Sequence, residues 1–201
     1  MGPTILVAGL DPALANFGIA RMWLDLETLD LRLDRFRTVV TEKLAGKKKQ
    51  IRQNSDDLRR ARALHGVMHE ELTDCRFCFA EIPSGAQHAR SALGFGVAIG
   101  VLSSCRIPMF EVMPMETKLG SVGDKKADKP DIIRWAAKRY PEAPWERYDA
   151  DTRGKTPRLK GDLHVDNEHV ADAIAIVHAG IRLPEFKQSL AFLKLGVAQV
   201  S

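Results

Sequence analysis

The sequence predicts an α/β fold in which a five-stranded mixed sheet is flanked by helices. The first observation is that three consecutive N-terminal segments have strand patterns and are separated by short turns, which makes them antiparallel neighbours. The second is that two further short apolar runs are separated by segments with helical periodicity, and strands connected through a helix usually lie parallel. A sheet with both kinds of connection is mixed.

The first strand is expected at residues 4–11, where an unbroken apolar run ends on Asp11 and is followed by Pro12. A run that is apolar on both faces is typical of a strand in the centre of a sheet, and Pro12 cannot continue its pairing. A carboxylate at that end needs a metal ion, a basic side chain or solvent as its partner. In the alternative interpretation, Asp11 only begins the turn at residues 11–16.

The next segments complete an antiparallel meander and return the chain to the sheet. Residues 17–27 and 29–36 alternate between apolar and polar side chains, which indicates a half-buried hairpin. Residues 52–73 then carry apolar side chains at helical spacing beneath a charged face. A second short buried strand follows at residues 76–81 and, like the first, ends in an acid, Glu81.

Residues 88–105 are expected to form a helix that contains Gly94, Gly96 and Gly100. Inside a helix, each glycine costs about 1 kcal/mol relative to alanine. A close approach by another element, either the sheet or a second subunit, would compensate for this cost. The fifth strand is expected at residues 108–113.

The rest of the chain adds helices and loops, and we expect residues 1–201 to form one domain. Asp166 or Asn167 can cap the second of the three remaining helices, and Gly180 can end it. In order, the segments are a polar connection at 115–129, a helix at 130–140, a charged loop-like insert at 142–162, a helix at 166–180 and a C-terminal helix at 184–199.

The composition limits the class of protein. Hydrophobic residues make up 45% of the chain, and the sequence has no long apolar span and no charged-then-apolar leader, so we expect a cytoplasmic protein that does not contact a membrane. The net charge of +4, with basic clusters at residues 47–52, 59–62 and 125–129, favours a polyanionic partner or, equally well, a solvated basic surface. Cys75 and Cys78 point to opposite faces of the expected strand, so we interpret them as reduced structural thiols.

Four side chains carry the predicted chemistry: Asp11, Glu81, His169 and Asp172. The order of elements is that of the ribonuclease H fold, in which the first and fourth strands lie side by side and would bring Asp11 and Glu81 together. His169 and Asp172, three residues apart, project from one face at the start of a buried helix. Clustered carboxylates repel one another unless a hard cation intervenes, which predicts two Mg²⁺ or Mn²⁺ ions that promote phosphodiester hydrolysis. His169 would bind a metal or take the proton of the attacking water.

The sequence also resembles the RuvC-type Holliday-junction resolvases over most of its length. The residues that carry this resemblance are, in order, Leu6–Pro12 with Asn16–Gly18, Phe79–Glu81, Ser91–Gly100, Pro114 with Lys118, Gly123–Lys129 and His169–Ala175. The resemblance implies that Asp11, Glu81 and Asp172 hold the metals, with His169 where the family has a histidine or an acid. It implies that Lys118 and Lys129 lie beside the scissile phosphate, and we add Lys125 and Lys126 as expected DNA contacts from the same basic segment.

The same family implies a homodimer that nicks opposing strands of a four-way DNA junction, with the glycine-containing helix near the dimer interface. Two departures stand out. Ala13 occupies a position where the family often has glycine, and residues 82–85 lack the bulky aromatic that commonly follows the glutamate and wedges into the junction.

Other functions remain open at the level of sequence. A nuclease of the same superfamily that acts on forks, flaps or RNA–DNA hybrids fits the missing aromatic better. A non-catalytic DNA-binding module would use the same lysines without cleavage. The opening strand, acid and turn also resemble those of actin-like and sugar-kinase ATPases, but no second copy of that motif is present.

Overall fold

The computed structural model describes residues 2–44, 53–153 and 156–198, and these form a five-stranded sheet in the order β3-β2-β1-β4-β5. The strands are β1 (Thr4–Asp11), β2 (Asn16–Asp25), β3 (Leu31–Val40), β4 (Phe77–Ala80) and β5 (Met109–Glu111). The helices are α1 (Gln53–Leu72), α2 (Ala89–Ser103), α3 (Pro114–Gly120), α4 (Lys129–Arg139), the 3₁₀ turn η1 (Val165–Asn167), α5 (Glu168–Gly180) and α6 (Pro184–Ala198).

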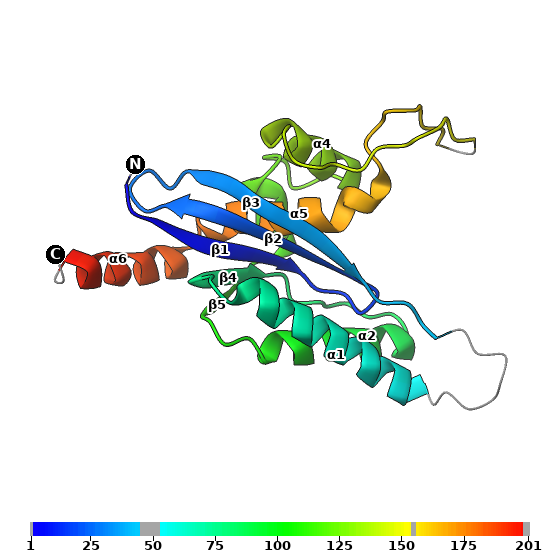
Figure 1. Ribbon diagram of the computed structural model, residues 1–201, viewed down its shortest axis with the longest axis horizontal. Helices are drawn as coiled ribbons and strands as arrows, with labels where there is room; N and C mark the ends of the chain where they lie inside the picture. The colour runs from blue at the N-terminus through cyan, green and yellow to red at the C-terminus, as the bar shows by residue number, and fades with distance from the viewer. Residues whose placement is uncertain (1, 45–52, 154–155, 199–201) are drawn as a thin grey trace.

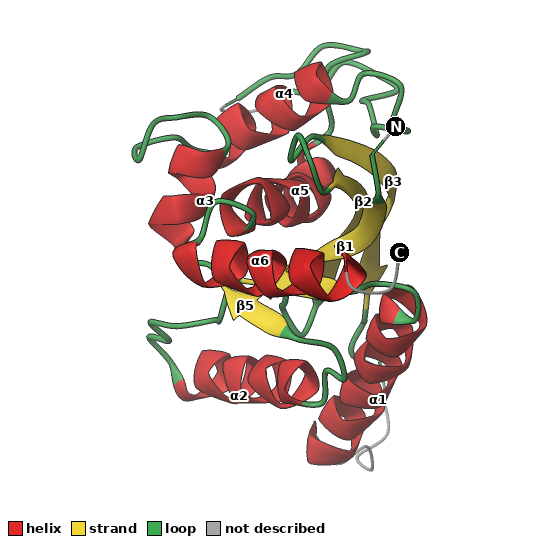
Figure 2. Ribbon diagram, turned by 90° about the vertical axis from the view of Figure 1, so that its left-hand side faces the viewer, coloured by secondary structure: helices red, strands yellow, loops and turns green. Residues whose placement is uncertain are grey.

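The predicted mixed sheet is confirmed. β1 pairs antiparallel with β2 and parallel with β4, so it lies in the centre of the sheet. Helices cover both faces, with α1 and α2 on one side and α4 and α5 on the other (Figures 1 and 2). Side chains alternate along β1 accordingly: Leu6 and Ala8 join the core beneath α1 and α2, whereas Val7 joins the core beneath α5.

Two glycines allow α5 to lie directly on the sheet. A Cβ at Gly9 would fall 1.9 Å from the carbonyl oxygen of Ala173, and a Cβ at Gly18 would fall 2.0 Å from that of His169. Only glycine fits at such distances, so the sequences of β1 and β2 set how closely α5 approaches. Because Gly18 pairs with Asp11 across the β1–β2 ladder, this contact brings the start of α5 to the carboxyl end of β1.

One helix was not expected from the sequence. Residues 115–129 had the composition of a polar connection, but α3 forms at Pro114–Gly120. Pro114 stands in its first turn, and the Glu116 carboxylate accepts a hydrogen bond from the Met113 amide over 2.8 Å. Gly120 then packs against α5, since a Cβ there would lie 2.7 Å from the Cα of Ala179. Tertiary packing therefore stabilises a helix too short to show a hydrophobic period.

The glycines of α2 do not pack against the sheet. A Cβ at Gly96 or Gly100 would meet no heavy atom within 4 Å among the described residues, and one at Gly94 would meet only Leu14, at 3.9 Å. The interpretation that the sheet compensates for these glycines is therefore wrong. The same helix exposes Leu93 and Ile99 by 44% and 40%, so it presents an apolar face to solvent.

The arginines of the 59–62 cluster are partly structural. Arg60 is 3% exposed and donates to the carbonyl of Leu14 over 3.1 Å and to the hydroxyl of Thr41 over 3.0 Å. Arg59 donates to Asp56. The bonds of Arg60 tie α1 to the turn after β1 and to the segment after β3, whereas the bond from Arg59 to Asp56 lies within α1. This part of the basic cluster therefore has protein partners. Residues 47–49 and Arg52, which form the first basic cluster, lie outside the described residues.

Several smaller features bear on the sequence predictions. Cys75 precedes β4 instead of lying within it, and all three cysteines are free. Gly180 is the last residue of α5, as expected, and a glycine is needed there because a Cβ would lie 2.1 Å from the ring of Phe79. The 142–162 insert folds back on itself at the Arg147–Leu163 bridge. In the described part of the chain, no helix has both the length and the apolar character that crossing a membrane requires.

Candidate active site

Asp11 and Glu81 lie at neighbouring strand ends. In the parallel β1–β4 ladder Leu10 pairs with Ala80, so the next residue on each side is an acid. Phe79 packs beneath α5 and Ala80 on the opposite face, and alternation therefore directs Glu81 to the α5 face, where Asp11 also points. The sheet register thus brings the two predicted carboxylates to one edge and one face.

α5 adds His169 and Asp172 to the same place. His169 Nδ1 lies 2.8 Å from Asp11 Oδ2, and each of these side chains is about one-fifth exposed. Asp172 follows one turn later on the same face of α5. The structure therefore brings together all four residues that the sequence singled out.

The electrostatics of these groups show how close the negative charges are. Burial, followed by the charges of Asp11 and Glu81, raises the pKa of Asp172 to about 8. Burial also raises the pKa of Glu81, which a hydrogen bond from Thr117 partly offsets. The pKa of His169 is raised chiefly by its hydrogen bond to Asp11, in spite of partial burial. Without a cation, the fold holds these acids together against their mutual repulsion.

Thr117 is a site residue that sequence reasoning missed. Its Oγ1 donates to Glu81 Oε1 over 2.6 Å, and the residue is 2% exposed. The missed signal is the start of α3, where a proline in the first turn and Glu116 at the third position form a capping pattern. Recognising that helix would have placed Thr117 and Lys118 on it together.

The predicted lysines fall into two groups. Lys118 on α3 is close enough to Glu81 for its charge to lower the pKa of that carboxyl, against the larger effect of burial. Lys129 forms an ion pair with Glu168, which raises the lysine pKa, and the charges of Asp172 and Asp11 add to that effect. Both therefore border the acidic cluster.

The other two lysines follow α3. Lys125 and Lys126 lie exposed in the turn between α3 and α4, and the backbone amide of Lys126 bonds to Asp124. Glu168, in contrast, was not predicted. It lies at the first position of α5, partners Lys129, and adds a further acid that raises the pKa of Asp172.

The donor set fits a hard divalent cation. Three carboxylates and one imidazole converge, and carboxylate oxygen is the preferred ligand of Mg²⁺ and Mn²⁺. A different group, Glu146, His164 and Asp166, has one ligand atom from each residue within 4.8 Å of the others. Among the described residues, Asp11, Glu81 and Asp172 do not form so tight a group.

A cleft opens beside His169 between the ends of β2 and β3 and the start of α5. Its volume is about 670 Å³, and its wall includes Asn16, Thr38 and Glu168. Of the four predicted site residues, His169 is the one that forms part of its wall.

The fold is similar to that of solved RuvC structures. No protein-family model and no curated protein matches the sequence. RuvC from Thermus thermophilus in complex with a Holliday junction substrate has a TM-score of 0.60 and 19% identity, covering 87% of this chain and 92% of that chain. A second Thermus thermophilus RuvC structure has a TM-score of 0.58 with the same identity and coverage. The fowlpox virus Holliday junction resolvase has a TM-score of 0.47 and 10% identity over 88% of this chain and 97% of its own. The predicted fold class is confirmed.

Proposed function

We propose that this protein is a metal-dependent, structure-specific DNA endonuclease that nicks opposing strands of four-way junctions. The observation that carries the proposal is the convergence of Asp11, Glu81 and Asp172 at one edge of the sheet. The fold supports it, since a RuvC of the same architecture has been captured with a Holliday junction substrate. The net charge of +4 is consistent with a nucleic-acid partner.

In this mechanism Asp11, Glu81 and Asp172, with His169 beside them, would hold two Mg²⁺ or Mn²⁺ ions. When bound, such ions activate water as a nucleophile and stabilise the leaving oxygen of the phosphodiester. His169 is engaged by Asp11 through Nδ1, which leaves Nε2 free to accept a proton from water. Lys118 and Lys129 would neutralise charge on the phosphate, with Lys125 and Lys126 contacting DNA further away.

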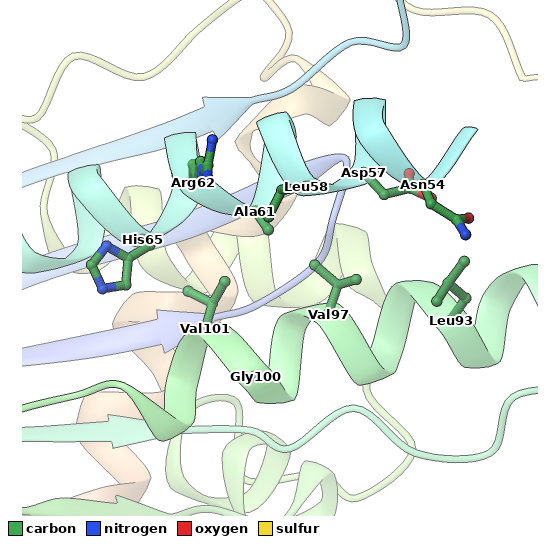
Figure 3. Close-up of a pocket in the computed structure, with 10 residues that line it drawn as sticks. All are labelled: Asn54, Asp57, Leu58, Ala61, Arg62, His65, Leu93, Val97, Gly100 and Val101. Atoms are coloured by element: carbon green, nitrogen blue, oxygen red, sulfur yellow. The ribbon is translucent and has the colours of Figure 1, made fainter. Parts of the chain in front are cut away.

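The second part of the proposal is a homodimer formed through α2. Gly96 and Gly100 leave the backbone of α2 open to close approach by another helix, and Leu93 and Ile99 supply exposed apolar area beside them. An apolar groove of about 470 Å³ runs between α1 and α2 (Figure 3). Its apolar wall is formed by Leu58, Ala61, Leu93, Val97 and Val101.

A second copy of the chain suits this surface, because a two-fold dimer gives the two active sites that paired nicking requires. The interface is isologous under this symmetry, so the apolar face of α2 would meet the same face of its partner.

A cytoplasmic location remains a prediction.

A broader nuclease acting on forks or flaps is the second candidate. It is favoured by the segment after Glu81, where residues 82–88 form no helix or strand and contain no aromatic ring larger than the exposed imidazole of His88. Without a wedging aromatic, discrimination for four-way junctions has to come from elsewhere, and the dimer geometry is the remaining source.

A cleavage panel separates the two candidates. Labelled four-way junction, three-way fork, 5′ flap, RNA–DNA hybrid and linear duplex are each incubated with the protein and Mg²⁺, or with EDTA. We expect paired symmetrical nicks confined to the four-way junction and no product in EDTA. Equal cutting of forks and flaps would establish the broader nuclease, and Mg²⁺-independent binding without any cutting would leave only a DNA-binding role.

A further inference from the structure

A buried hydroxyl lies directly behind one of the proposed metal ligands. Thr117 Oγ1 is 2.6 Å from Glu81 Oε1 and 3.4 Å from the carbonyl oxygen of Met113, four residues back on the same helix. A hydroxyl has a single proton to donate. The carboxylate is much the closer acceptor and carries negative charge, so it receives that proton.

This arrangement differs from the usual behaviour of a helical hydroxyl. A serine or threonine inside a helix commonly donates to the carbonyl four residues back. Ser121, the residue that follows α3, does so to the carbonyl of Thr117 over 2.6 Å. Thr117, within α3, instead turns its hydroxyl to a side chain 36 residues away in sequence. The helix backbone therefore does not account for the orientation of Thr117.

The hydroxyl is held firmly, whereas its partner has few other constraints. α3 is fixed against α5 by Gly120, and threonine is stiff about χ1 because its Cβ is branched. Glu81 follows the end of β4, its amide lies 3.4 Å from the carbonyl of Leu10, and no regular structure follows until α2. The hydrogen bond thus lets the firmly held Thr117 hydroxyl restrict the orientation of the Glu81 carboxylate.

We propose that Thr117 is a positioning residue for Glu81. By holding Oε1 it leaves Oε2 as the oxygen that Glu81 presents toward Asp11 and Asp172. This inference rests on the proposed function, since it assigns the orientation of a carboxylate whose role there is to bind a cation. Residues that hydrogen-bond to metal ligands commonly change metal affinity or activity by about 10- to 100-fold when they are removed.

The test measures Mn²⁺ binding to the DNA-free protein by isothermal titration calorimetry, for wild type, Thr117→Val, Thr117→Ser, Asp172→Asn and Ser121→Ala. We expect Thr117→Val to weaken Mn²⁺ binding by about tenfold, Thr117→Ser to restore most of the affinity, and Ser121→Ala to match wild type. In cleavage assays Thr117→Val should raise the Mn²⁺ concentration for half-maximal rate more than it lowers the rate at saturating Mn²⁺.

The outcomes separate the inference from the function beneath it. Wild-type Mn²⁺ affinity in Thr117→Val, together with lost affinity in Asp172→Asn, would overturn the role of Thr117 and keep the metal site. Mn²⁺ binding that Asp172→Asn leaves unchanged would overturn both. Should Thr117→Val fail to fold, Thr117→Ser and Thr117→Ala give the same comparison, because both lack the methyl group and only serine keeps the hydroxyl.

Discussion

The fold opposes the ionisation of Asp172. Burial, followed by the charges of Asp11 and Glu81, raises its pKa from 3.8 to about 8. An acid whose pKa is higher in the folded than in the unfolded state makes its full contribution to stability only at a pH low enough for it to be protonated in both states. As pH rises above 3.8 the unfolded chain loses that proton first, so the metal-free fold is progressively destabilised until the pH passes about 8.

Asp172→Asn should therefore stabilise the metal-free protein in a pH-dependent way. Asparagine carries no charge, so in EDTA we expect its Tm to exceed that of wild type by several degrees at pH 8, with the gain shrinking toward pH 4. Thermal unfolding followed by circular dichroism from pH 4 to 9 measures this. Asp149→Asn, at an exposed loop position, is the control. If Asp172→Asn raised the Tm by the same amount at every pH, the raised pKa of Asp172 would be disproved.

The lysines beside the acids should act through charge. Lys118→Ala is expected to slow cleavage about 100-fold, the lower end of the loss seen when one donor that stabilises transition-state charge is removed. It should also reduce the slope of log affinity against log salt by about one. Lys187→Ala on α6 is the matched control. Cleavage and fluorescence-anisotropy binding at several salt concentrations test this, and an unchanged salt slope would argue against phosphate contact.

Lys129 has a second role, because it also forms an ion pair with Glu168. Lys129→Ala removes a positive charge from the proposed DNA-binding surface and leaves Glu168 to repel Asp172 more strongly. We expect it to weaken DNA binding as Lys118→Ala does, but to require less Mg²⁺ for half-maximal cleavage, because loss of a positive charge beside the acids favours cation binding. Equal Mg²⁺ requirements for the two variants would show that the Glu168 ion pair has no effect on the site.

At the scale of elements, the contact between β2 and α5 positions the site. Gly18→Ala would place a Cβ 2.0 Å from the His169 carbonyl, so α5 must move away from the sheet. We expect about 1–3 kcal/mol of lost stability, as in other overpacked cores, with a large loss of cleavage as His169 leaves Asp11. Urea unfolding and cleavage rates measure both.

Gly66→Ala is the control for this substitution, because nothing lies within 4 Å of a Cβ at that helical position. It should be neutral, or stabilise the protein by up to about 1 kcal/mol through helix propensity. A Gly18→Ala variant with wild-type stability and wild-type cleavage would mean that α5 is not held by this contact.

The elements that sequence could predict are those with strong local signals. β1 and β4 are short apolar runs that stop on an acid, and α5 is an apolar helix headed by polar residues. α3 could not be read from periodicity because its seven residues span only two turns and its stability comes from packing on α5. No local pattern indicates that Thr117 faces Glu81, because that contact joins residues 36 apart in the chain.

In the candidate site, too, only the features with a local sequence signal could be predicted. Asp11, Glu81, His169 and Asp172 were predictable because the strand ends and the helix start mark them, and the sheet register then brings them together. The pairing of Lys129 with Glu168 depends on how α4 lies against α5, which no local pattern encodes. For the α2 glycines the sequence left two alternatives, close packing against the sheet or against a second subunit. The structure excludes the sheet.

At the scale of the whole molecule, the central prediction is the dimer. Ile99→Glu places a charge on the exposed apolar face of α2, where burial against a partner would be costly. We expect wild type to be dimeric and Ile99→Glu to be monomeric by light scattering, with paired nicks replaced by single ones. Phe192→Glu, at an exposed position on α6, should remain dimeric. A monomeric wild type at working concentrations would make coordinated two-strand cleavage untenable.

The most direct test of the account compares wild type with Asp11→Asn and Asp172→Asn on a labelled four-way junction, following binding and cleavage in the same samples with Mg²⁺ or EDTA. We predict that wild type cuts only with Mg²⁺, and that both variants bind the junction with nearly wild-type affinity but do not cut it. Cleavage by either variant at the wild-type rate, or cleavage by wild type in EDTA, would contradict a metal-dependent site built on these carboxylates.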